Sequence, residues 1–575
     1  MKKIRSMQVL FAATACLVSA WALGIESTSS TYEISIYDSI PLYFWIAIVA
    51  GYIMFSIGLV IPPRESTKGL MGANLLGLTG INLLLGALPT LRYGTYYTQW
   101  DIWIYLGQTS YITNTGRLDL TTNFYPGLHL LWTSVALATG ESVYTIGMLL
   151  AAPIEALRIP LVFVLTSRMF GNRTTGAYAS VLASIPDGFI GTYASPWSYS
   201  LTLLLVFLVA LSMRHAQIGF SATLLAILLA LALVVAHPLA PLFLLIAFAV
   251  SPVVNLVARR MWKQDTEASP NNLQKLSVRG IVAILIVVYV TWIAYQTLVL
   301  QVSVSRLLAA FTEAGVLSPA TFGRFLTPEL LAKIFGGSAI LGTYWLGGVA
   351  YVRRAVPNHT FRIQRLAISL VIAGILTGVV FEIIASSALL GDFVQRPLNV
   401  VALVLPILGG VFLERKLVAG GQQARKVLWT SAACAIPFVL ALAAMYPSPY
   451  VSLFNYQNTS ELYAGVDWSA SHIPVGPELF SNSYLGRYAF YPWYSGNSAY
   501  SRLYHVEDTL PGTLTELASQ GLRGNYVLID QESVEVATAD LRAWSFPNVH
   551  DVEVLQRLAG VSRVYDNGEV QIYLL

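Results

Sequence analysis

Long apolar runs are the feature that most constrains what this chain can fold into. A helix needs about 20 apolar residues to cross the hydrocarbon core of a bilayer. Windows of that size recur along the chain as far as residue 446, and we predict about thirteen spans from them. They lie near residues 7–24, 41–61, 70–90, 143–167, 175–193, 197–213, 219–236, 239–257, 279–299, 336–352, 366–386, 397–413 and 428–446. The sequence therefore predicts an all-α membrane bundle.

Composition supports the same fold class. The chain is 55% hydrophobic and only 11% charged, whereas soluble proteins carry about 25% charged residues. The first apolar run has two interpretations, because Lys2, Lys3 and Arg5 precede a short apolar core, as in a signal peptide. No convincing cleavage site follows that core, so we predict a span there.

Lysine and arginine are distributed unequally between the segments that connect the predicted spans. One alternating set of segments carries 21 of them and the other carries six. Cytoplasmic loops of membrane proteins are enriched in these residues. We therefore predict a multi-pass plasma-membrane protein with a cytoplasmic N-terminus and an extracytoplasmic C-terminal domain.

The predicted domains are a membrane domain, residues 1–446, and a soluble domain, residues 447–575. In the soluble domain, residues 525–529 predict a buried strand, and residues 562–573 predict a hairpin with Asn567-Gly568 at its turn. This domain should be mixed α/β. Aromatic residues are frequent over 484–504, where they would either stack on sugars or anchor the domain at the membrane surface.

Two outer segments adjoin each other in the membrane domain. Residues 91–125 form a long loop between predicted spans, and we expect it to carry the chemistry. Residues 126–140 are apolar but too short to cross the bilayer. We interpret them as a juxtamembrane helix on the outer face, since a span there would invert every later loop.

Ionisable residues are costly at membrane depth and invite a functional interpretation. The predicted topology places several of them at the outer surface: Asp101, Asp187, His237, Glu382, Asp392 and Arg396. Structural alternatives exist for two of these residues. His237 precedes a proline and would only end a helix, and Asp187 would cap or bend a helix beside Pro186. Asp101 follows Trp100 in a loop that no packing argument requires.

Glu155 and Arg158 lie in the middle of a predicted span. Their spacing of three residues places them on one helix face. They form either a structural ion pair or part of a polar substrate cavity.

The arrangement resembles the GT-C superfamily of membrane glycosyltransferases. Asp101 and Tyr105 lie in the first long outer loop, which continues to His129 through the run Tyr125-Pro126-Gly127-Leu128. Residues 167–173 look like that family's basic turn after its second core helix. Asp187 follows the next helix in a family-like position, and the pair Asp392 and Arg396 is predicted in a late outer loop.

The resemblance implies transfer of a sugar from a polyprenyl or dolichyl phosphate or diphosphate to an acceptor on the outer side. The acceptor would be a protein, a lipid or a glycan. Asp101 would act as general base, and Arg396 would meet the donor phosphate. The resemblance and the outer-surface placement together mark seven substrate-binding candidates: Arg396, Asp392, His237, Asp187, Glu382, His129 and Tyr105.

The sequence leaves open whether the reaction requires a metal ion. Members of the superfamily often carry two adjacent acidic residues in the first loop, but Ile102 follows Asp101 here. A single carboxylate anchors a divalent cation poorly. No cofactor is firmly predicted, although Mg²⁺ or Mn²⁺ would be bound if Asp392 supplied a second acid.

Other functions compete with this one. A lipid-linked glycan flippase or secondary transporter would show internal repeats and polar groups at the midplane. A polysaccharide polymerase or ligase would favour arginine-rich outer loops, and a scaffold would not need the long loop 91–125. The chain has no phosphate-binding glycine loop for ATP-driven transport. Its basic residues are explained by topology, so we expect membrane lipids and no nucleic acid as partners.

Overall fold

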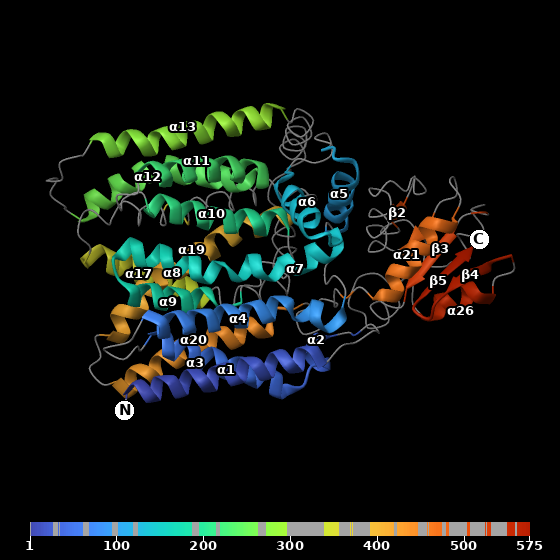
Figure 1. Cartoon of the computed structure of the whole chain (residues 1–575), viewed down its shortest axis with the longest axis horizontal. Helices are drawn as coiled ribbons and strands as arrows, with labels where there is room; N and C mark the ends of the chain where they lie inside the picture. The colour runs from blue at the N-terminus through green and yellow to red at the C-terminus, as the bar shows by residue number, and fades with distance from the viewer. Residues whose placement is uncertain are drawn as a thin grey trace, which may run out of the picture.

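A computed structural model gives the arrangement of the chain (Figure 1). The structure describes residues 2–26, 33, 35–60, 68–94, 102–118, 125–186, 195–213, 219–262, 272–295, 339–355, 369, 371, 391–418, 423–446, 457, 459–473, 479–481, 503–505, 524, 526–530, 549–557 and 560–575.

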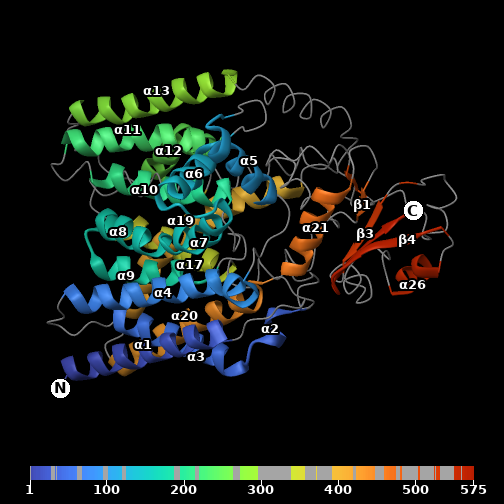
Figure 2. The same ribbon diagram turned by 45° about the vertical axis from the view of Figure 1, so that its right-hand side comes forward.

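Helices that lie side by side make up the larger part of the molecule (Figures 1 and 2). They are α1 (Lys2–Glu26), α3 (Leu42–Val60), α4 (Lys68–Tyr93), α7 (Val143–Ala156), α8 (Arg158–Phe170), α9 (Arg173–Ala183), α10 (Pro196–Met213), α11 (Gly219–Ala236), α12 (Leu239–Trp262), α13 (Asn272–Tyr295), α17 (Ala339–Ala355), α19 (Gly391–Val418) and α20 (Gln423–Ala443). The predicted all-α bundle is confirmed.

The bundle has the length and composition of a membrane domain. Among the described residues, four helical stretches are long and apolar enough to cross a bilayer: Leu42–Val60, Gly69–Tyr93, Val143–Phe170 and Pro196–Met213. Shorter apolar helices occupy most of the other predicted spans. The predicted span 366–386 lies outside the described residues except for Ser369 and Val371, which are helical. The chain is thus a multi-pass membrane protein.

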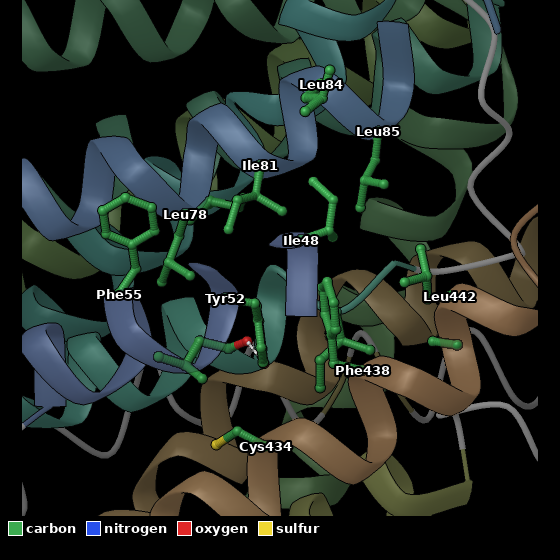
Figure 3. Packing of buried hydrophobic residues seen from close by; sticks show 14 of the residues in the cluster. Ile48, Tyr52, Phe55, Leu78, Ile81, Leu84, Leu85, Cys434, Phe438 and Leu442 are labelled. Carbon is green, nitrogen blue, oxygen red and sulfur yellow. Dashed lines mark hydrogen bonds between the residues drawn. The ribbon is translucent and has the colours of Figure 1, made fainter. Parts of the chain in front are cut away.

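The centre of one half of the bundle is the contact of α3 with α4 and α20 (Figure 3). Tyr52 of α3 stacks on Phe438 of α20 with ring centroids 3.8 Å apart. Its hydroxyl donates to the backbone carbonyl of Val181, at 3.0 Å. Tyr446, just after α20, likewise donates to the carbonyl of Leu85, at 2.6 Å. Helix backbones in this half are therefore joined by buried tyrosine hydroxyls as well as by apolar packing.

Glycines allow α19 to pack closely against two neighbours. A Cβ atom on Gly410 would lie 2.6 Å from the backbone nitrogen of Ala179 in α9. A Cβ atom on Gly348 of α17 would lie 1.9 Å from the carbonyl oxygen of Leu408. Small residues commonly permit such close approach between membrane helices. These contacts fix the position of α19 along the bundle.

The predicted span 143–167 is interrupted. α7 ends at Ala156 and α8 begins at Arg158, and Pro160 has no N–H to continue the helical hydrogen bonds. Thr202 Oγ1 donates to the carbonyl of Ile154 at 3.2 Å, and Arg158 Nε donates to the backbone carbonyl of Glu155 at 3.3 Å. The contact observed between Glu155 and Arg158 thus satisfies a backbone carbonyl at the break.

The N-terminus and the C-terminal domain lie at opposite ends of the bundle (Figures 1 and 2). Three further helices lie at the end that carries the C-terminal domain, which we call the domain-side end: α2 (Ile36–Ser39), α5 (Ile102–Thr115) and α6 (Gly127–Thr139). The region predicted as loop and juxtamembrane helix is therefore on the same side as the C-terminal domain.

The C-terminal domain is mixed α/β, as predicted. Its sheet has the strand order β2-β1-β3-β5-β4. The elements are α21 (Ser460–His472), β1 (Leu479–Ser481), β2 (Leu503–His505), β3 (Tyr526–Asp530), α26 (Val549–Arg557), β4 (Ser562–Asp566) and β5 (Val570–Leu574). The predicted hairpin is confirmed, with β4 and β5 antiparallel and Gly568 at a φ of 96° in the turn. The predicted aromatic segment 484–504 lies outside the described residues except for Leu503 and Tyr504 in β2.

Three distant segments of the chain meet at a buried ion pair. Arg92 at the end of α4 binds Glu33 through both carboxylate oxygens, and the two side chains are 10% and 14% exposed. The backbone N–H of Glu33 donates to Oε1 of Gln457 at 2.7 Å. We call these three residues the Glu33 junction. It ties the segment between α1 and α2, the end of α4 and the start of the C-terminal domain to one another.

Candidate functional site

The candidate site is built on the helix pair α5 and α6. α5 begins at Ile102, the residue that follows Asp101 in the sequence. It ends before Gly116, whose φ of 65° is unfavourable for residues with a side chain. α6 ends at Gly140 in the same way, with a φ of 76° and an N–H that donates to the Ala136 carbonyl. Left-handed glycines thus limit both helices to about three or four turns.

α6 matches the prediction of a short surface helix. Its 13 residues cover about 20 Å, less than the roughly 30 Å of a hydrocarbon core. One face, which includes His129 and Trp132, is fully buried, while Leu137 is 67% exposed. α6 therefore rests on the domain-side end of the bundle and leaves an apolar face outside.

His129 is held in one orientation by α5. Its Nδ1 lies 2.9 Å from Thr109 Oγ1 and 3.1 Å from the backbone carbonyl oxygen of Tyr105. The Thr109 hydroxyl itself donates to that carbonyl, at 2.7 Å. Because the carbonyl can only accept and the Thr109 hydrogen is already used, Nδ1 must carry the imidazole proton. Nε2 of the neutral ring is then an acceptor.

The environment of His129 keeps the ring neutral. The side chain is completely buried, and burial lowers its pKa from the model-peptide value of 6.5 to about 4, against a smaller opposing effect of the hydrogen bond to Tyr105. Nε2 is buried, and none of the described residues forms a hydrogen bond with it. At neutral pH His129 therefore presents an unprotonated nitrogen inside the α5–α6 pair.

Aromatic rings connect His129 to His237, on the other side of the site. Tyr105 packs edge-on against both His129, at 5.7 Å between centroids, and Tyr125, at 6.4 Å. Tyr125 stacks on His237 at 4.9 Å. Trp197, at the start of α10, packs edge-on against His237 with ring centroids 5.1 Å apart and is the last ring of the row. We call these five residues the ring row.

Gly127 brings α6 against the end of α11. A Cβ atom on Gly127 would lie 2.8 Å from Cα of Ala236 and 3.1 Å from its backbone nitrogen. His237 follows Ala236 and is 3% exposed, and its Nδ1 accepts from the Leu239 N–H at 3.2 Å. The predicted role of His237 in ending a helix is therefore correct, and the same residue also belongs to the ring row.

The structure brings three of the eight predicted site residues together: Tyr105, His129 and His237. Asp101, Asp187 and Glu382 lie outside the described residues. Asp392 and Arg396 belong to the first two turns of α19, so the prediction that they lie in a loop was wrong. α19 has 28 residues and is about 42 Å long, which exceeds the bilayer core and lets the helix continue through these charges.

Sequence reasoning did not find Thr109 or Trp197. Thr109 lies one helical turn after Tyr105, and its function becomes visible only when α6 places His129 against it. One sequence feature could have indicated Trp197, namely its position directly after Ser195-Pro196 at the start of a helix. Among the described residues, no three His, Cys, Asp or Glu side chains form a group suited to a metal ion.

No family model matches the chain, and no curated protein matches it in sequence. Among solved structures, the chain is similar to ArnT from Cupriavidus metallidurans in the apo state. The match covers 88% of this chain and 98% of that one, with 12% sequence identity and a TM-score of 0.46. ArnT is a polytopic membrane glycosyltransferase of the GT-C family.

Proposed function

We propose that this protein is a GT-C-type membrane glycosyltransferase. It transfers a sugar from a polyprenyl or dolichyl phosphate or diphosphate to a protein, lipid or glycan acceptor at the outer face of the membrane. Three features support the proposal: the membrane bundle, the short α5–α6 pair at its domain-side end, and the ring row there.

The ring row is the observation that carries the proposal. Five aromatic or imidazole rings from α5, the segment before α6, α6 itself, α10 and the α11–α12 turn meet at one end of the bundle. A lipid-linked sugar presents its phosphate and sugar at the membrane surface, and the rings lie at the domain-side end of the bundle rather than in its middle. Ring faces and hydrogen-bonding edges are suited to sugars, which have both apolar faces and hydroxyl groups.

The proposed reaction needs a base, a phosphate-binding cation and, with a metal, a second acid, and we propose one residue for each. Asp101 directly precedes α5 in the sequence and acts as general base toward the acceptor. Arg396, in α19, neutralises charge on the leaving phosphate. Asp392 would be the second carboxylate if a Mg²⁺ or Mn²⁺ ion takes part.

Transfer of a radiolabelled sugar from a polyprenyl-phosphate donor tests this function. We expect Asp101→Asn to lower the rate by about 10²–10⁴-fold, the usual contribution of a general base. Glu141→Gln is the matched control, since Glu141 is an exposed acid in the turn after α6. Equal rates for wild type and Asp101→Asn would exclude Asp101 as the base.

The second candidate is a lipid-linked glycan flippase or secondary transporter. The break between α7 and α8 favours it, because transporters commonly build sites from interrupted helices near the midplane. Glu155 and Arg158 lie at this break. If the wild-type protein transferred sugar from no lipid-linked donor but moved such a lipid across vesicles, this function would replace the first.

A further inference from the structure

We propose that Nε2 of His129 is the acceptor for a hydroxyl group of the sugar that the enzyme transfers. The inference rests on the proposed function and gives it a specificity-determining residue. The ligand it requires is an O–H donor directed at one nitrogen atom. A buried water molecule would offer the same O–H chemistry, and the experiment below separates the two sources.

His129 is held as the tautomer that is protonated on Nδ1. Nδ1 points at two oxygen atoms, the Tyr105 carbonyl and Thr109 Oγ1, and neither has a free hydrogen to give. The proton is therefore on Nδ1, and Nε2 has a lone pair. His237 is a natural contrast, since its Nδ1 accepts from the Leu239 N–H and its proton must be on Nε2. The two buried imidazoles are held as opposite tautomers.

Nε2 of the same ring is buried. His129 is 0% exposed, and no donor in the part of the chain that the structure describes reaches Nε2. A buried acceptor without a donor is unfavourable, and a ligand or a water molecule can complete it. Thr109 and the Tyr105 carbonyl fix the orientation of the ring through their contacts with Nδ1.

His129 lies at one end of the ring row. His129 contacts Tyr105, the ring from which the ring row continues through Tyr125 to His237. Ring faces bind sugars with little dependence on the pattern of hydroxyl groups. A fixed acceptor beside them would distinguish a sugar that has a hydroxyl at the right carbon from one that lacks it.

Thr109 is a positioning residue in this scheme. Its hydroxyl connects His129 to the α5 backbone without facing the proposed ligand. Thr109→Val would leave only the Tyr105 carbonyl to orient the ring. Thr109→Ser keeps the hydroxyl and should restore the wild-type preference among sugars.

The test compares two variants that each retain one half of the imidazole. In His129→Asn, the amide nitrogen takes the place of Nδ1 and the acceptor is lost. In His129→Gln, the amide oxygen reaches toward the place of Nε2 and an acceptor is kept. The probes are a radiolabelled polyprenyl-phosphate hexose and its monodeoxy analogues, assayed with the full-length protein in detergent.

We expect His129→Asn to transfer the complete hexose about ten-fold more slowly, the usual effect of an unmatched hydroxyl in a buried site. His129→Gln should keep most of the rate. For one deoxy analogue, wild type and His129→Asn should react equally, because the hydroxyl that needs the acceptor is missing. Equal rates on the complete hexose would overturn the proposal. A ten-fold loss on every analogue would also overturn it, since that result indicates a buried water or a structural role.

A second measurement does not depend on activity. With ¹⁵N-labelled histidine, the free protein should show an unprotonated Nε2 in His129 and an unprotonated Nδ1 in His237. Adding the polyprenyl-phosphate hexose should shift the His129 Nε2 resonance, and adding the single deoxy analogue should not. A shift without transfer would support the inference while removing the proposed function. Transfer without a shift would do the reverse.

Discussion

The α3–α4–α20 packing and the α5–α6 pair use their side-chain hydrogen bonds for different purposes. In the first region, Tyr52 and Tyr446 each donate to a carbonyl of another part of the bundle. In the second region, hydrogen bonds join Thr109, the Tyr105 carbonyl and His129 Nδ1, and no donor among the described residues reaches Nε2. The two tyrosine hydrogen bonds of the bundle join separate helices, whereas those of the α5–α6 pair hold one imidazole ring in a fixed orientation.

This contrast predicts that changes in the first region lower stability, while changes in the second lower activity. The largest effect should come from Gly127→Ala. Its new Cβ atom would meet backbone atoms of Ala236, which cannot move aside like a side chain. A shift of α6 by about 1 Å can cost on the order of 100-fold in rate. Transfer assays should show this loss with a nearly unchanged melting temperature.

The matched control for that substitution is Gly72→Ala in α4, where nothing lies within 4 Å of the new Cβ atom. It should leave both rate and stability unchanged. A large loss of folded protein in Gly127→Ala would contradict the contrast, because it would make the α6–α11 contact a main source of stability.

A smaller effect is expected from Tyr446→Phe. The change removes the hydroxyl that donates to the Leu85 carbonyl and leaves that buried acceptor unmatched. The free energy of unfolding should fall by about 1–3 kcal/mol, and the transfer rate per folded molecule should stay constant. Chemical denaturation in detergent measures the first quantity. Tyr295→Phe is the control, since Tyr295 is 65% exposed, and a slower rate in Tyr446→Phe would show that the two regions are coupled.

The smallest effect concerns pH. The pKa of His129 is lowered to about 4 in the folded protein, whereas an unfolded histidine titrates near 6.5. Between pH 4 and pH 6.5 the unfolded state binds a proton at this histidine that the folded state does not bind. The contribution of neutral His129 to the free energy of unfolding is therefore complete above about pH 6.5 and falls as the pH decreases toward 4. From pH 7 to 5.5 the free energy of unfolding should fall by about 1 kcal/mol because of His129. His129→Gln should remove this dependence, and an unchanged pH dependence in that variant would assign it to other groups.

Apolar windows predicted the bundle well because a bilayer imposes a fixed length on each span. The prediction 41–61 corresponds to α3 at Leu42–Val60, and 197–213 corresponds to α10 at Pro196–Met213. The apolar windows misplaced the start of α19, which begins at Gly391 rather than at the predicted residue 397. Asp392 and Arg396 lower the hydropathy there, but a helix end that projects beyond the hydrocarbon tolerates charge.

The candidate site was less predictable than the bundle. Tyr105 and His129 were selected through a resemblance, and their contact depends on how α5 and α6 pack. The tautomer of His129 depends on Thr109, which lies 20 residues earlier in the chain. No local pattern encodes which nitrogen of a histidine finds a carbonyl. Hydropathy therefore located the region, and only the three-dimensional packing revealed how its atoms are arranged.

The Glu33 junction also sets an order of events during synthesis. Glu33 leaves the ribosome 424 residues before Gln457, its partner at the start of the C-terminal domain. At about 5–20 residues per second, that interval is on the order of 20–80 s. Arg92 arrives only 59 residues after Glu33, so the ion pair can form early and hold the segment between α1 and α2 in place. The first helices of the chain are then already arranged when the C-terminal domain is synthesised and docks.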